Sequence, residues 1–347
     1  MGKKIYFLSP SNAEPTGGVK QIYRQANILR GLGLESYLLI KKKDKSKNKW
    51  YHAENVVYNY HIFKRILGSI SKNNITFYNR IKSFVASRND EIIGRDSIVV
   101  LPEIYGSNMH KLLPENHYVI FNQNCYYTFQ HYSTDYPEEN PYTNSRCLGV
   151  IVASDDAHFY LSYTFPDLKI FKITLGIDDN YFFPGQFKKK KIAYMPRKLQ
   201  EDSVQVINIL KARKNLKNWE FFPIDNLSER EVASHMKESV FFLSFNHREG
   251  FGLPPVEAMA CGCFVIGYAG QAGKEYFHEE FSAVIPDGDI ITFVKTIEAY
   301  ALQFEENEAE ILQKGKKASS FVLEKYSMLN EELSTKKAWQ SIITQLD

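Results

Sequence analysis

Short hydrophobic runs alternate with amphipathic segments along the whole chain. The apolar run Lys4–Pro10 precedes Val19–Arg30, where hydrophobic residues recur every three or four positions, and the apolar run Ser36–Ile40 follows. The first and third runs are typical of buried strands. The middle one is typical of a helix, with Gly31 and Gly33 as its stop. This order predicts parallel strands joined by a right-handed crossover.

The same alternation continues through both halves of the chain. Further strands of the first half are expected at Ser97–Leu101, Tyr118–Phe121, Gly149–Ala153 and Ile170–Leu175. Strands of the second half are expected at Ile192–Met195, Glu220–Pro223, Val240–Ser244, Phe264–Gly267 and Ala283–Pro286. Helices of the second half are expected near Val204–Lys211, Ser228–Lys237, Pro255–Ala260 and Ile290–Leu302. We therefore predict an α/β protein with two Rossmann-like parallel-sheet domains rather than one barrel.

The turn Pro184-Gly185 and the basic run Lys188–Lys191 separate the two alternations. A length of 347 residues also exceeds what one core usually fills. The expected domains are 1–183 and 184–327, followed by a C-terminal helix at 328–347 that either stands apart or crosses back to the first domain. Such sheets bind ligands at the carboxyl ends of their strands, so we expect the chemistry in the loops that follow the strands.

Composition is that of an ordinary globular protein, with 44% hydrophobic and 24% charged residues. No apolar run reaches the roughly 18–20 residues of a membrane-spanning helix. The N-terminal run ends at Ser9-Pro10 without the cleavage site of a signal peptide, so we interpret it as a buried strand. The four cysteines form neither a disulfide framework nor a zinc pattern, and Cys261 and Cys263 are interpreted as small core residues. Because this cysteine usage fits a reducing compartment, we expect a cytoplasmic protein.

Charge is distributed unevenly along the chain. Residues 1–100 carry 18 Lys/Arg and 7 Asp/Glu, a net +11, whereas the rest carry 25 and 33, a net −8. The lysines of Lys41–Lys49 and the mixed apolar and basic residues of Ile62–Arg88 suit an anionic membrane surface that presents a lipid-linked acceptor. A core helix with a solvated basic face explains the second segment equally well. Residues 41–88 are thus a candidate contact with the inner face of the plasma membrane, and no nucleic-acid-reading motif accompanies them.

The segment Arg248–Gly262 follows a predicted strand directly and carries the strongest candidate chemistry. Glu249 and Glu257 flank Gly250-Phe251-Gly252-Leu253, and the glycines and prolines of this stretch argue against a helix before Pro255. The loop is expected to present backbone N–H groups to an anion at a helix N-terminus. The carboxylates suit sugar and ribose hydroxyls, although Glu257 alone is explained as well by the helix dipole. The whole segment predicts a sugar-nucleotide site.

This segment resembles the E-x7-E signature of retaining glycosyltransferases with the GT-B fold, the large family four that includes glycogen synthase-like and bacterial polysaccharide enzymes. The resemblance extends over residues 4–290 and implies two domains that face each other across a cleft. In that family the first acid, here Glu249, contacts the transferred sugar, and the second, here Glu257, contacts the ribose. Glu249 is therefore implied as catalytic, and Gly250–Leu253 with Glu257 as donor contacts.

Other segments agree in the same order. Gly17-Gly18-Val19 resembles the family's glycine loop near the donor phosphates, Leu175–Asp178 resembles the end of its first domain, and Gly270–Glu275 resembles its G-G-x-x-E turn. Arg197 and Lys198 stand where the family places an Arg and a Lys on the donor pyrophosphate, although the family separates the two by several residues. The resemblance implies Arg197 as catalytic and donor-binding, and Lys198 as donor-binding. A solvated basic turn is the alternative interpretation.

The acceptor is expected on the first domain. Many relatives carry a His there, whereas this chain has amides after the strand, and an amide binds sugar hydroxyls but cannot act as a base. The base is then another group or the leaving phosphate. The candidate acceptor-side residues are Glu103, Asn122, Gln123 and Asn124. Aromatic residues crowd the next loop, where they either stack on sugar rings or pack on their own domain: Tyr126, Tyr127, Phe129, Tyr132, Tyr136 and Tyr142.

Asp287-Gly288-Asp289 has the D-x-D form of a metal motif but is interpreted as a turn, and no other cluster has metal spacing. We therefore expect neither a metal nor another cofactor, only a nucleotide-diphosphate sugar as co-substrate. The expected function is transfer of a hexose-type sugar, with retention, to a saccharide or lipid-linked acceptor in surface polysaccharide or glycolipid synthesis. A sugar-nucleotide epimerase of the same fold and a non-catalytic partner subunit are the alternatives. Loss of Glu249 or Arg197 would have favoured the partner subunit, and both residues are present.

Overall fold

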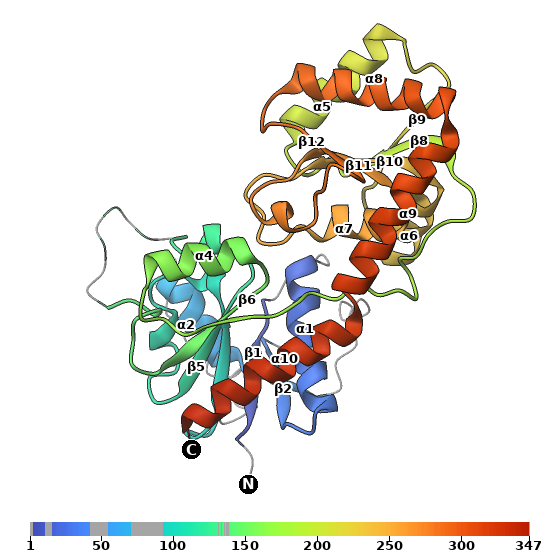
Figure 1. The fold of residues 1–347 in the computed structure, drawn as a ribbon. Coiled ribbons are helices and arrows are strands. Elements are labelled where there is room, and N and C mark those ends of the chain that lie inside the picture. The colour runs from blue at the N-terminus through green and yellow to red at the C-terminus, as the bar shows by residue number, and fades with distance from the viewer. Residues whose placement is uncertain are drawn as a thin grey trace. The chain divides into compact units, whose positions relative to one another are not determined.

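Two compact units make up the chain. The computed structural model describes residues 3–10, 16–41, 55–70, 93–130, 132, 134, 136 and 139–346. Unit 1 comprises Met1–Ile173 and Glu332–Asp347, and unit 2 comprises Thr174–Glu331. Each unit contains a parallel sheet with helices (Figure 1), so the predicted α/β class with two parallel-sheet domains is confirmed. No helix in the described ranges has the length and apolar character needed to cross a membrane.

The sheet of unit 1 has its described strands in the order β3-β2-β1-β4-β5-β6-β7, all parallel. The strands are β1 (Ile5–Leu8), β2 (Ser36–Ile40), β3 (Val56–Tyr58), β4 (Ile98–Pro102), β5 (His117–Asn122), β6 (Cys147–Val152) and β7 (Ile170–Lys172). Within the described part of residues 1–173, the α-helices are α1 (Gly17–Gly31), α2 (Tyr60–Ile70) and α4 (Asp155–Thr164). All five residues of β4 are buried, as in the interior of a sheet that helices cover.

Helix α10 (Met328–Ile343) returns the end of the chain to unit 1 from Glu332 onward. In Figure 1 the red α10 lies beside the blue α1, and the hydroxyl of Thr335 donates a hydrogen bond to Gln25 Oε1 at 3.1 Å. The buried ring of Trp339 lies 5.9 Å from that of Phe7 in β1. The last helix therefore completes the core of unit 1.

The division between the units lies earlier than the expected boundary at 183/184. Residues from Thr174 onward belong to unit 2, and they pair with Tyr326 and with the first turn of α10. The N–H of Ile177 donates to the carbonyl of Tyr326 at 2.7 Å, and the N–H of Gly176 donates to the carboxylate of Glu331 at 2.9 Å. Because these partners are far apart in sequence, no local sequence pattern marks the boundary between the units.

The sheet of unit 2 has the order β12-β11-β10-β8-β9, again all parallel. Its strands are β8 (Lys189–Tyr194), β9 (Glu220–Pro223), β10 (Ser239–Phe245), β11 (Phe264–Tyr268) and β12 (Ser282–Val284). Its α-helices are α5 (Gln200–Arg213), α6 (Glu229–Glu238), α7 (Leu253–Ala260), α8 (Ile290–Glu306) and α9 (Glu308–Lys325). Cys261 and Cys263 are buried free thiols, as expected of small core residues.

Helix α9 has no counterpart among the expected elements. Gly315 lies in its middle, and a Cβ atom there would lie 2.3 Å from the carbonyl oxygen of Gly262. The hydroxyl of Ser319, one turn later, donates to the carbonyl of Ala260 at 2.7 Å. The glycine that weakens the local helical pattern is thus what lets α9 approach the end of α7.

The start of the predicted basic segment Ile62–Arg88 belongs to the core. Ile62 and Phe63 of α2 are 4% and 5% exposed and pack in the hydrophobic core of unit 1. This part behaves as the core helix that was the alternative to a membrane element. Residues 42–54 and 71–92, which include most of the lysines of Lys41–Lys49, lie outside the described residues.

Candidate functional site

The carboxyl edge of the unit 2 sheet brings the main candidate residues together. Strands β8 and β10 are neighbours, and the loops that follow them carry Arg197-Lys198 and Glu249. Lys198 Nζ and Glu249 Oε1 form an ion pair between these loops. Parallel neighbours end at the same edge of a sheet, which is why residues 51 positions apart meet here.

The loop from Gly250 to Leu253 is shaped by one left-handed glycine. Gly252 has φ 85° and forms the N-cap of α7. A Cβ atom on it would lie 2.4 Å from Asn246 Nδ2 and 2.7 Å from the hydroxyl of Tyr276. Only glycine fits this position, because both the backbone angle and the space exclude a side chain.

Helix α7 begins at Leu253, two residues before the start expected from the prolines. Pro254 and Pro255 fall in its first turn, where a residue without an N–H loses no helical hydrogen bond, so the prediction of no helix before Pro255 was wrong. Glu257 is consequently the fifth helical residue and lies half-buried beyond the first turn. The helix dipole acts chiefly within the first turn and thus explains Glu257 less well than expected.

Four consecutive backbone N–H groups at this loop are free to bind a ligand. Within the described residues, no hydrogen bond is donated by the N–H of Gly250, Phe251, Gly252 or Leu253. Gly250, Phe251 and Gly252 are nevertheless buried, and buried N–H groups require a partner. A row of such donors where a helix begins suits an oxyanion.

Tyr276 holds this loop in place and had no signal in the sequence. Its buried hydroxyl donates to the carbonyl of Phe251 at 2.7 Å, and Asn246 Nδ2 lies 3.5 Å from the same oxygen. Burial first, and then the neighbouring Tyr326 and Glu249, raise the pKa of Tyr276 well above its ordinary value. The hydroxyl therefore stays protonated and remains a donor.

Arg197 pairs with a different carboxylate from Lys198. Its Nε lies 2.9 Å from Asp225 Oδ1, in the loop after β9, and its side chain is 69% exposed. The N–H of Lys198 bonds back to the carbonyl of Met195, and Leu199 then adopts φ 39° at the N-cap of α5. In this tight turn the adjacent side chains of Arg197 and Lys198 therefore pair with different carboxylates, those of Asp225 and Glu249.

The D-x-D segment Asp287–Asp289 forms a turn that caps the N-terminus of α8. Asp289 accepts the N–H of Thr292 at 3.0 Å as the N-cap of α8, and Gly288 has φ 78°. Asp287 Oδ2 lies 3.3 Å from His247 Nδ1. In the described part of the chain no three His, Cys, Asp or Glu side chains gather as metal ligands.

In unit 1, two candidate residues meet at the carboxyl edge of the sheet. Gln123 follows β5, and its Nε2 donates to the carbonyl of Gly18, near the start of α1, at 3.0 Å. Gly17 is the first residue of that helix, and Thr16 caps it by accepting the N–H of Val19 at 3.3 Å. The glycine loop and the amide run are thus joined directly.

Glu103 is a buried carboxyl group at the end of β4. It is 3% exposed, and its Oε1 accepts the N–H of Asn124 at 3.0 Å. Burial raises the pKa of Glu103 to about 7, against the lowering effect of backbone hydrogen bonds from residues 103, 123 and 124. The group therefore titrates near neutral pH and links the loops after β4 and β5.

Asn122 and Asn124 are engaged within unit 1. Asn122 Nδ2 donates to Thr128 Oγ1 at 3.0 Å and to the hydroxyl of Tyr142 at 2.9 Å, and the residue is fully buried. Asn124 accepts the N–H of Tyr126 through its side chain and is 8% exposed. Gln123, in contrast, is half-buried, so it is the amide of this run best placed for an acceptor.

The aromatic loop after β5 packs largely on its own unit. Tyr142 stacks on Phe165 with ring centroids 4.9 Å apart, and Phe129 contacts the same ring. Tyr127 and Tyr136 remain 44% and 61% exposed. Packing on the own domain, one of the two expected alternatives, therefore holds for Tyr142 and Phe129.

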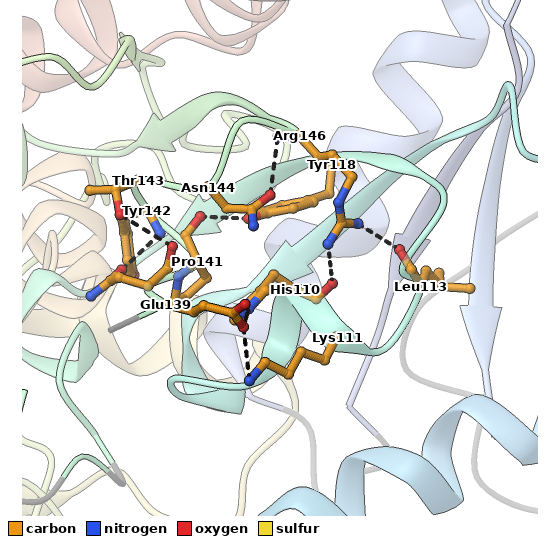
Figure 2. A network of polar contacts seen from close by, with 11 residues as sticks. His110, Lys111, Leu113, Tyr118, Glu139, Pro141, Tyr142, Thr143, Asn144 and Arg146 are labelled. Atoms are coloured by element: carbon orange, nitrogen blue, oxygen red, sulfur yellow. Dashed lines mark hydrogen bonds and ion pairs between the residues drawn. The ribbon is translucent and has the colours of Figure 1, made fainter. Parts of the chain in front are cut away.

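A polar network fixes the ends of this loop (Figure 2). The guanidinium of Arg146 donates to the carbonyls of His110 and Leu113, each at 2.9 Å. The hydroxyl of Tyr118 donates to the carbonyl of Pro141 at 2.6 Å, and Glu139 lies 3.0 Å from Lys111 Nζ. These contacts satisfy the carbonyls of His110 and Leu113, which precede β5, and that of Pro141, which precedes β6.

Known proteins are similar to part of unit 2 in sequence and to almost the whole chain in fold. Residues 199–318 match the family model of the glycosyl transferases group 1. Unit 2 thus contains a glycosyl transferases group 1 domain. An alpha-1,6-glucosyltransferase of Actinobacillus pleuropneumoniae serotype 7 (strain AP76) is 29% identical over 192 residues, 52% of this chain and 54% of the relative. The chain thus spans about half of that curated relative.

Solved structures of glycosyltransferases agree with the fold over almost the full length. Sucrose-phosphate synthase from Thermosynechococcus elongatus has a TM-score of 0.67 at 13% identity, covering 99% of this chain and 100% of that one. The pneumococcal O-GlcNAc transferase GtfA, solved in complex with UDP and GlcNAc, has a TM-score of 0.64 at 14% identity and covers 99% of both chains. The chain therefore has the GT-B architecture of these glycosyltransferase structures.

Proposed function

We propose that this glycosyltransferase moves a hexose-type sugar, with retention, from a nucleoside-diphosphate sugar to a saccharide or lipid-linked acceptor in surface polysaccharide or glycolipid synthesis. The observation that carries the proposal is the row of four unused N–H groups, Gly250 to Leu253, beside the cation of Lys198. Backbone donors and cations at a helix N-terminus suit a diphosphate. Glu249 beside them suits the electron-poor anomeric carbon of the transition state.

Each unit has its own part in this proposal. Unit 2 binds the donor through Arg197, Lys198, Glu257 and the loop at α7. Unit 1 binds the acceptor through Gln123 at its carboxyl edge, with Glu103 holding that loop. The α-1,6-glucosyltransferase relative supports a hexose donor, and the GtfA complex makes UDP the first nucleotide to test.

A thermal-shift panel tests the donor class. UDP, GDP, dTDP and ADP, each with its glucose conjugate, are added to the protein. The matching nucleotide should stabilise it by about 2.7 kcal/mol at a hundredfold excess over its Kd. If none of the four shifts the melting temperature, the proposed function fails.

Transfer assays then test the reaction itself. The anomeric proton coupling of the product reports the stereochemical outcome, and inversion would contradict the proposed retention. A chelator should leave the rate unchanged, because Arg197 and Lys198 are proposed to hold the phosphates without a metal. An epimerase would instead convert the donor sugar in the absence of any acceptor.

Membrane binding is proposed for residues 41–88, which carry 12 Lys/Arg and 2 Asp/Glu. The protein should sediment with anionic vesicles of phosphatidylglycerol at low salt and dissociate as salt screens the attraction. Equal binding to neutral phosphatidylcholine vesicles at every salt concentration would contradict this location.

A further inference from the structure

We infer that Asp225 positions the guanidinium of Arg197 for the donor diphosphate. This role rests on the proposed function, because the anion in question is the diphosphate of the nucleotide sugar. Asp225 follows β9, which is the neighbour of β8 at the edge of the unit 2 sheet. Its loop and the Arg197 turn therefore emerge side by side.

Both oxygens of Asp225 are held. Oδ1 is shielded from solvent and lies 2.9 Å from Arg197 Nε, as an ion pair without hydrogen-bond alignment. Oδ2 accepts a hydrogen bond from Asn226 Nδ2 at 3.1 Å. The hydrogen bond at Oδ2 orients the carboxylate, and its shielded Oδ1 then provides a defined place for the guanidinium.

The backbone on both sides of the pair is unusual. Among the described residues, three non-glycine residues have positive φ: Leu199, Lys214 and Asn226. Asn226 follows Asp225 directly with φ 54°, and Leu199 comes two positions after Arg197 with φ 39°. Asparagine tolerates this region, whereas leucine is strained there, and such strain collects at functional sites. Both turns are thus held in conformations that set where the pair lies.

The pair leaves the guanidinium available to a ligand. In the described part of the chain no hydrogen bond uses the N–H groups of Arg197, and its side chain is 69% exposed. A guanidinium has five N–H donors in a planar fork, which suits phosphate oxygens. Exposed ion pairs of this kind contribute little to stability, so the contact is better explained by placement of the arginine.

The two possible roles of Asp225 predict opposite changes in anion affinity when the aspartate is removed. A negative charge near an anion site repels the anion, so its removal should strengthen binding if charge were its only effect. If Asp225 places Arg197, its removal should weaken binding instead, because the arginine loses its orientation. The direction of the change therefore decides between the two roles.

Calorimetry with UDP and UMP on five proteins tests the inference. These are the parent, Asp225→Ala, Arg197→Ala, the double variant and the control Glu298→Ala. Glu298 pairs with Arg213 Nε at 2.8 Å between α8 and α5, so the control breaks a similar ion pair in the same unit. Asp225→Ala should bind UDP up to about fivefold more weakly, which corresponds to about 1 kcal/mol, with a smaller loss for UMP. Glu298→Ala should bind as the parent does.

The double variant separates positioning from a merely structural effect. Asp225→Ala should cause no further loss in the Arg197→Ala background, because the aspartate acts through the arginine. Unchanged or tighter UDP binding by Asp225→Ala would overturn the inference, and so would an equal loss in both backgrounds. Asp225→Asn provides the same comparison if the alanine variant does not fold. If the parent binds none of UDP, GDP, dTDP or ADP, the proposed function itself fails.

Discussion

Lys198 and Glu249 form an ion pair between the loops that follow β8 and β10. The cation expected on the donor diphosphate is thus paired with the carboxylate expected at the transferred sugar. A diphosphate that binds Lys198 competes with Glu249 for the same ammonium group. Donor binding would therefore release the carboxylate toward the sugar.

Replacing Glu249 with glutamine should separate turnover from nucleotide binding. The amide keeps the side-chain size but loses the charge that favours an electron-poor anomeric carbon. We expect kcat to fall by a factor on the order of 10²–10³, as when other oriented electrostatic groups are removed. UDP should bind as well as before or more tightly, because Lys198 loses its competing carboxylate. Steady-state kinetics and calorimetry measure the two effects, and near-normal turnover would refute the catalytic role of Glu249.

Replacing Glu257 with alanine should have the complementary effect. If this carboxylate accepts the ribose hydroxyls, its loss removes charge-assisted hydrogen bonds and weakens UDP itself by roughly 1.5–3 kcal/mol. Ribose contacts are equal in the ground and transition states, so KM should rise while kcat changes little. An unchanged Kd for UDP would mean that Glu257 does not contact the ribose.

Gly252 offers a test of the loop at α7 with a matched control. Gly252 and Gly33 have φ of 85° and 84°, but a Cβ at Gly33 meets no atom within 4 Å, whereas one at Gly252 meets Asn246 and Tyr276. The left-handed penalty of about 1–2 kcal/mol is therefore common to both alanine variants. Gly252→Ala should be the less stable of the two and should lose UDP affinity at least tenfold. Equal UDP binding by both variants would show that the loop does not hold the diphosphate.

The elements that depend on neighbouring residues could be predicted from the sequence. Ser36–Ile40 and Glu220–Pro223 are strands with the predicted bounds, because short apolar runs are bounded there by turn residues. The meeting of Lys198 with Glu249 was also predictable, since both follow parallel strands and share one edge of the sheet.

Features that depend on distant residues could not be predicted. Helix α9 exists beside α7 because Gly315 leaves room for the carbonyl of Gly262, a contact absent from any local pattern. Tyr276 and Asp225 are ordinary residues in sequence. They gain their roles only when folding places the hydroxyl on the carbonyl of Phe251 and the carboxylate beside the guanidinium of Arg197.

Glu103 predicts a dependence of stability on pH. Its pKa in the folded protein is about 7, above the ordinary value of 4.5, because the carboxyl is buried. Between pH 4.5 and 7 the folded state keeps a proton that the unfolded state has lost. The stabilisation from Glu103 is therefore complete below pH 4.5 and declines as pH rises to 7. The total loss is roughly 3 kcal/mol, since one pKa unit corresponds to about 1.36 kcal/mol.

Replacing Glu103 with glutamine should remove this dependence, because the amide does not ionise. The amide oxygen can accept the N–H of Asn124 as the protonated carboxyl does, so pH 4.5 is the reference point at which the two proteins are first compared. The variant's free energy of unfolding relative to the parent should then rise by roughly 3 kcal/mol between pH 4.5 and pH 8. Denaturant unfolding of both proteins across this range measures the difference, with the exposed Glu332→Gln in the same unit as the control. A difference that stays constant with pH would show that the buried carboxyl of Glu103 titrates as an ordinary glutamate.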